Sequence, residues 1–152
     1  MSDERIGPAA VAFQVLLGND EYIKLLHDYV WSICEETIWI LPYPKDLRID
    51  LRTAATIMDL SEIAIGMEHK LEDRLIQRIR LEIERRVFQD YIENHGSPEI
   101  SWWKSTNNWN GVCNGGVGAA FLLLEDNVDR LALALEIVLE GLQTFVDVAF
   151  AE

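Results

Sequence analysis

The sequence predicts an all-α protein built from antiparallel helical hairpins. Apolar residues recur at three- and four-residue spacing along most of the chain, and no stretch has the alternation of apolar and polar residues that marks a strand. Glycine, proline and asparagine interrupt the pattern at intervals, which indicates short connections between helices. A length of 152 residues, 49% of them hydrophobic, is sufficient for one domain with a buried core.

The first two predicted helices are bounded by turn-forming residues. Pro8 starts the first helix and Gly18 ends it. The second helix runs from about residue 21 to 40, with Asp20 as its cap, and ends before Pro42.

Two further helices follow in the middle of the chain. One runs from about residue 47 to 67, and its small and apolar positions indicate burial on more than one face. The next runs from about residue 72 to 92 and has one apolar row and one charged face. Glu82 and Arg86 lie one turn apart on that face, where they form a favourable pair. We expect this charged face to be solvated.

The last two predicted helices come after a loop of about a dozen residues, which Asn94, Gly96 and Pro98 open. A fifth helix is predicted from about residue 108 to 124, and a sixth from about residue 127 to 150. Because their connection is short, we expect them to form an antiparallel hairpin.

Charge and composition limit the partners. The chain has 26 acidic and 13 basic residues, a net charge of −13, which disfavours nucleic acid and anionic membrane surfaces. Cys34 and Cys113 lack metal-ligand spacing, so we expect buried free thiols. No segment is long enough to span a membrane, and the N-terminus lacks a signal-peptide pattern. We expect a soluble protein, cytoplasmic as given, or periplasmic or secreted if an export signal has been removed, with no metal and no cofactor.

The segment from residue 100 to 118, ISWWKSTNNWNGVCNGGVG, has the most unusual composition in the chain. It contains three tryptophans, four asparagines and four glycines. Indole rings stack on sugar faces, and amides hydrogen-bond hydroxyls and carboxylates, so this composition favours a carbohydrate site. Asn107 and Asn108 lie at the predicted start of the fifth helix, where side-chain amides, backbone N–H groups and the helix dipole favour an anion.

Residues around these asparagines are candidate substrate contacts. They are Trp103, Trp109, Trp102, Asn110, Lys104 and His95. Each also has a structural interpretation: a tryptophan can be a core ring, an asparagine can cap a helix or bond backbone, and the lysine and histidine can be ordinary surface residues. The residues alone leave these alternatives open.

The run from Thr106 to Glu125, TNNWNGVCNGGVGAAFLLLE, resembles the signature segment of heparinase II/III-type polysaccharide lyases, a group related to some alginate lyases. Residues 49 to 93 are similar to the helix pair that usually precedes that segment. The resemblance implies that the chain is the N-terminal part of an incomplete (α/α) toroid. It also implies cleavage of a uronate-containing acidic polysaccharide by β-elimination, with Asn108 first and Asn107 second as the groups that neutralise the carboxylate.

The resemblance further implies a catalytic tyrosine on a later toroid helix and a histidine beyond it, and neither has a position in this chain. We therefore expect the isolated chain to lack lyase activity. Two alternatives remain. One is an (α/α) toroid glycoside hydrolase, which needs two carboxylates on one groove, with Glu99 and Glu125 as the acids that bracket the motif. The other is a noncatalytic helical module that binds carbohydrate or protein and forms a homo-oligomer through exposed hairpin faces.

Overall fold

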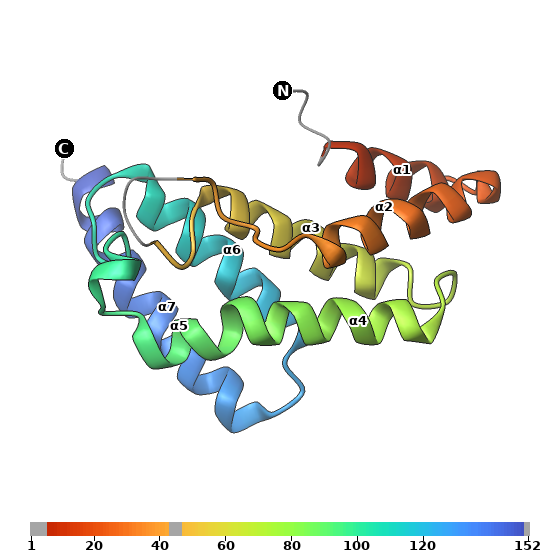
Figure 1. Cartoon of the computed structure of the whole chain (residues 1–152). Helices are drawn as coiled ribbons and strands as arrows, with labels where there is room; N and C mark the ends of the chain where they lie inside the picture. Colours follow the sequence, from red (N-terminus) through yellow and green to blue (C-terminus); the bar gives the residue numbers. More distant parts are fainter. Residues whose placement is uncertain (1–5, 43–46, 151–152) are drawn as a thin grey trace.

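A computed structural model describes residues 6–42 and 47–150 of the chain (Figure 1). All regular secondary structure in these ranges is helical, and no strand occurs in them. The predicted all-α class is therefore confirmed. Pro42 lies at the edge of the first range, whereas Pro44 lies outside the described residues.

The first hairpin consists of α1 (Ile6–Leu16) and α2 (Ile23–Glu35). The chain turns at Gly18, whose φ of +92° is a left-handed conformation that favours glycine. The prediction that Asp20 caps the second helix is wrong, because Asp20 lies inside a short 3₁₀ turn that precedes α2. Its carboxylate instead forms an ion pair with Lys70 at the far end of the second hairpin.

The second helix ends at Glu35 and not near residue 40, as the sequence had predicted. Two side chains, one nearby in the sequence and one distant, explain this early end. The indole of Trp39 donates a hydrogen bond to the carbonyl oxygen of Ile33 at 2.9 Å, and the guanidinium of Arg86 donates to the carbonyl oxygen of Glu36 at 2.6 Å. The chain after α2 is thus held in a non-helical path against its own last turn and against a helix that comes much later in the sequence.

The second hairpin consists of α3 (Leu51–Gly66) and a long helix that follows it. Asp50 caps α3 by accepting a hydrogen bond from the backbone N–H of Thr53 at 2.7 Å, so this helix begins later than predicted. The long helix comprises α4 (Asp73–Ile83), a π-helical segment η2 (Glu84–Phe88) and α5 (Gln89–Asn94).

The third hairpin consists of α6 (Asn108–Leu124) and α7 (Val128–Ala149). Each helix has an asparagine cap: Asn107 accepts a hydrogen bond from the backbone N–H of Trp109, and Asn127 accepts one from that of Arg130, both at 3.0 Å. The predicted positions of these two helices are confirmed to within one residue.

The three hairpins pack side by side in two layers (Figure 1). In one layer α3 packs against both α1 and α6, and these three helices run in the same direction. In the other layer α2 packs against α4, and α5 against α7. The core lies between the layers, where the rings of Phe88 and Phe121 stack with centroids 3.8 Å apart and Tyr91 is fully buried.

The charged face of α4 is only partly solvated. Glu82 is 1% exposed and forms ion pairs with Arg78, Arg85 and Arg86. The predicted pair between Glu82 and Arg86 is confirmed, with 2.6 Å between Oε2 and Nε. Burial alone would raise the pKa of Glu82, but hydrogen bonds from Arg85 and Arg86 bring it below its ordinary value.

The first layer presents apolar side chains to solvent, on the side away from the core. We call this surface the apolar face. It comprises Phe13 and Leu16 of α1, Met58 and Ile65 of α3, and Val112 and Leu122 of α6, each between 41% and 62% exposed. On α3 the two residues are seven positions apart, two helical turns, so they lie along one stripe of that helix. Such a stripe is typical of a surface that packs against further protein.

Candidate functional site

The N-terminus of α6 is the candidate site, and its two asparagines differ in their environment. Asn107 is the cap: its Oδ1 accepts hydrogen bonds from the backbone N–H of Trp109 at 3.0 Å and from the Ser105 hydroxyl at 2.9 Å. Asn108 is the first residue of the helix, and its side chain is exposed. Both residues are exposed, but Asn107 uses its Oδ1 for capping, whereas the side chain of Asn108 makes no hydrogen bond within the described residues, at the positive end of the helix dipole.

A buried network of side-chain amides lies beneath this helix end. Asn110 donates to the carbonyl oxygens of Ser105 and Gly141, both at 2.8 Å. Asn114 donates to Asn110 Oδ1 at 2.8 Å and to the carbonyl oxygen of Trp103 at 3.0 Å, while Tyr91 donates to Asn114 Oδ1 at 2.6 Å. We call Tyr91, Asn110 and Asn114 the amide network. It ties the loop before α6 to α5 and α7.

The loop is also held by two tryptophans that lie in the core. Trp102 is 3% exposed and its indole N–H donates to the carbonyl oxygen of Ile49 at 2.7 Å. Trp103 is 9% exposed and donates to the carbonyl oxygen of Ile137 at 3.0 Å. Both rings were candidate sugar platforms or core rings, and in this structure each is covered by protein and donates its indole N–H to a carbonyl oxygen inside the fold.

Asn110 likewise departs from its expected role as a substrate contact. Its side chain is completely buried and is used in the amide network. Trp109 is half-buried and packs against the core. Within the described residues, the asparagines of the predicted set that stay exposed are thus Asn107 and Asn108, and of these only Asn107 is engaged by its own loop and helix.

His95 and Lys104 lie together at the surface over Trp103. The His95 ring meets the Trp103 ring edge-on with centroids 4.6 Å apart, and Lys104 Nζ lies 4.5 Å from the same indole. Lys104 also forms an ion pair with Glu140 at 2.6 Å, and this hydrogen bond lowers the pKa of Glu140. Lys104 is therefore neutralised by its partner, which weakens its expected attraction for an acidic sugar.

The sequence pattern did not predict a role for Gly141 in this region. Gly141 lies in the middle of α7, where a Cβ atom would approach Trp103 Nε1 to 2.6 Å and Asn114 Nδ2 to 2.8 Å. A lone glycine inside a long predicted helix was the available signal, because such a residue is costly unless another group approaches closely.

Nucleophilic or hydrolytic chemistry finds little support here. Burial raises the pKa of both cysteine thiols, Cys34 and Cys113, to about 12. Burial also raises the pKa of Tyr91, whose hydroxyl is committed to Asn114. The carbonyl oxygen of Glu99, before α6, accepts a hydrogen bond from the backbone N–H of Arg48, whereas the carboxylate of Glu125, after α6, forms an ion pair with Arg130 at 2.6 Å. The two acids thus have different partners, and no contact in the described residues pairs them as a hydrolase requires.

Within residues 6–42 and 47–150, no three side chains of histidine, cysteine, aspartate or glutamate gather in a way that could hold a metal ion. None of the helices in these ranges combines the length and apolar character needed to cross a bilayer.

Comparison with known proteins adds no family assignment: no family model matches this chain, and no curated protein matches it. Functional inference therefore depends on the residues and their geometry.

Proposed function

We propose that this chain forms part of the catalytic (α/α) toroid of a polysaccharide lyase of the heparinase II/III type, which cleaves uronate-containing polymers by β-elimination. In this proposal Asn108 receives the uronate carboxylate at the N-terminus of α6. The observation that carries it is the combination of an exposed Asn108 amide with the hydrogen bonds of the amide network in the first turns of the same helix.

The chemistry explains why such a group is useful. β-Elimination removes the proton on the carbon next to the carboxylate, forms a carbon–carbon double bond and expels the glycosidic oxygen. The difficult step is removal of this weakly acidic proton, because negative charge then develops on the carboxylate. Donors that are already oriented toward this charge lower the barrier, and removal of one such donor commonly lowers turnover by about 100-fold or more.

The support of the loop is consistent with this role. A donor acts best when its position does not change during the reaction. Two hydrogen bonds of the amide network reach the carbonyl oxygens of Ser105 and Trp103 in the loop that leads into α6, and the indole bonds of Trp102 and Trp103 also hold this loop. The proton acceptor must come from another segment or a partner, since the hydroxyl of Tyr91 is buried and committed.

The arrangement of the hairpins supports the toroid part of the proposal. A toroid consists of an inner ring and an outer ring of helices, in which the members of each ring run in the same direction. The layer formed by α1, α3 and α6 has this property, and its apolar face is available for further inner helices (Figure 1).

The test is the absorbance of unsaturated uronate products formed from alginate and glycosaminoglycans. The assay would use this chain and a longer protein in which further toroid helices follow it. For an active protein, Asn108→Ala should lower turnover at least about 100-fold. Asn19→Ala is the matched control, because Asn19 is an exposed amide between α1 and α2. The proposal would be overturned if the longer protein formed no unsaturated product from any uronate polymer. If Asn108→Ala reacted at an unchanged rate, Asn108 would have a structural role at the start of α6 and no role in turnover.

A second candidate function is favoured by one observation, the apolar face. A noncatalytic interaction module needs a surface of this kind, through which it binds another protein or a second copy of itself. Sedimentation at several protein concentrations, together with a pull-down for other partners, tests this alternative.

A further inference from the structure

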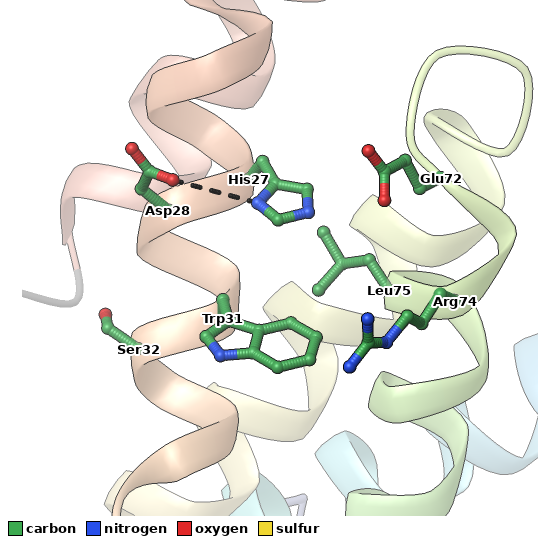
Figure 2. Close-up of a pocket in the computed structure, with 7 residues that line it drawn as sticks. All are labelled: His27, Asp28, Trp31, Ser32, Glu72, Arg74 and Leu75. Atoms are coloured by element: carbon green, nitrogen blue, oxygen red, sulfur yellow. Dashed lines mark ion pairs between the residues drawn. The ribbon is translucent and has the colours of Figure 1, made fainter.

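We propose that a groove between α2 and α4 binds an uncharged sugar ring. The groove has a volume of about 300 Å³, which is sufficient for a small ligand, and Figure 2 shows the residues that line it. It lies at the opposite end of the molecule from the N-terminus of α6 (Figure 1). The two sites share no residue, so this inference is independent of the lyase proposal.

The groove has an aromatic wall and an apolar floor. Trp31 of α2 is half-buried, whereas Trp39, Trp102 and Trp103 are buried in the core. The ring of His27 lies parallel to that of Trp31, with an interplanar angle of 2° and 6.1 Å between the centroids. The fully buried Leu75 forms the floor between the two helices (Figure 2). Flat apolar surfaces of this kind pack against the C–H face of a pyranose ring.

The opposite wall carries polar groups whose hydrogen-bonding capacity is unused. The guanidinium of Arg74 lies over the ring of Trp31, 5.4 Å from its centroid, in a cation–π contact at one side of the groove (Figure 2). Glu72 precedes α4 as its N-cap residue, but its side chain makes no cap hydrogen bond. Throughout the described chain, neither side chain has an ion pair or a side-chain hydrogen bond. A ligand with hydroxyl groups can accept from Arg74 and donate to Glu72.

The charges of the groove favour an uncharged ligand. Asp28, at the rim, is paired with Lys24 at 2.7 Å. The remaining formal charges, those of Glu72 and Arg74, cancel. Because these two charges cancel, neither an anion nor a cation gains a net attraction from the groove, and a purely apolar ligand would remove both groups from water without replacing their hydrogen bonds. A neutral polyhydroxyl ring stacks on Trp31 and satisfies both charged groups.

The test is a titration of the full chain followed by NMR, with cellotetraose, mannotetraose and xylotetraose as neutral probes. The indole N–H signal of Trp31 is assigned by its loss in Trp31→Phe. We expect at least one probe to shift this signal saturably, together with backbone amides near His27 and Arg74. Arg74→Gln and Glu72→Gln should each weaken binding about tenfold, which is about 1.4 kcal/mol. Both residues are exposed, so neither change should unfold the protein.

Glu68→Gln is the matched control, because Glu68 is exposed and does not line the groove. This variant should bind the probe as the unchanged protein does. The proposal is overturned if no neutral probe gives a saturable shift, or if Arg74→Gln and Glu72→Gln bind as tightly as the control. It is also overturned if only an oligogalacturonate or a zwitterion such as free glycine binds in this groove.

Discussion

At the scale of single residues, Gly141 illustrates how closely the loop before α6 is fitted to α7. Trp103 and Asn114 both occupy the space that a side chain at this position would need. The lack of a Cβ atom therefore allows the indole of Trp103 to reach the carbonyl oxygen of Ile137 and allows Asn114 to complete the amide network. The backbone conformation of this glycine is ordinary, so its role is purely one of space.

Gly141→Ala should therefore lower the free energy of unfolding by about 2–3 kcal/mol, because the added methyl group displaces Trp103 or Asn114. Urea denaturation measures this change. Gly115→Ala is the matched control: Gly115 is also inside a helix, but nothing lies within 4 Å of an added Cβ. That variant should gain about 0.5–1 kcal/mol from helix propensity. Equal stabilities of the two variants would contradict the steric role of Gly141.

The buried tryptophans and asparagines of the motif show why residue roles are difficult to predict from sequence. The composition of residues 100 to 118 indicated unusual polar and aromatic contacts, and these exist. However, whether an indole N–H meets a carbonyl oxygen or a sugar depends on segments far away in the chain. For Trp102 the partner is Ile49, and for Trp103 it is Ile137. No local pattern predicts such pairings.

At the scale of elements, the long helix of the second hairpin is organised around Glu82, the buried carboxylate of its charged face. Arg85 and Arg86 belong to the π-helical segment η2 and both bond Glu82, while Arg86 also holds the chain after α2. Glu82 thus connects α4, η2 and the end of the first hairpin. A buried carboxylate with three arginine partners contributes to stability only while it is ionised.

Glu82→Gln should lower the free energy of unfolding at pH 7 by about 2–3 kcal/mol, since it removes hydrogen bonds between charged groups. The pKa of Glu82 in the folded protein lies below its ordinary value of 4.5. Its contribution is therefore fully present above pH 4.5 and is lost as the pH falls through the folded-state pKa. Denaturation of both proteins between pH 7 and pH 3 should show the difference narrowing on acidification. A difference that is constant with pH would contradict this role.

Helix boundaries were predictable where local residues decide them. The starts of α6 and α7 follow asparagine caps, and a cap bonds the backbone two or three residues ahead. The end of α2 was not predictable, because it depends on Arg86, which lies 50 residues after Glu36. The early end of α2 is thus a tertiary effect that overrides local helix propensity.

At the scale of the whole molecule, the two layers of hairpins leave the apolar face uncovered. Both proposed functions use it, since further toroid helices or a second copy of the chain would cover it. Met58 and Leu122, on adjacent helices, are 41% and 62% exposed. Water contact with this much apolar surface is unfavourable at about 25 cal/mol per Å². The hairpin periodicity of the sequence predicted the helices, but not which face stays uncovered.

The isolated chain should therefore self-associate as its concentration rises, and sedimentation velocity measures this. Met58→Lys combined with Leu122→Lys should shift the equilibrium toward monomer by at least about tenfold in dissociation constant, because charged groups resist burial. Leu81→Lys is the matched control, since Leu81 is 54% exposed on α4 in the other layer. A monomer at all concentrations that also captures no partner in a pull-down would contradict the interaction module.

The rates at which the two buried thiols are alkylated would report how often each hairpin opens. Cys34 lies in α2 of the first hairpin and Cys113 lies in α6 of the third, and both are completely covered. Thiols are alkylated as thiolates, so each reacts only when its helix moves away from the core. Labelling by iodoacetamide, followed by mass spectrometry of the two peptides, would report the opening of each hairpin separately in the unaltered protein. We expect Cys34 to react first, because α6 packs against α3 on one side and α7 on the other, whereas the first hairpin lies at the end of the array.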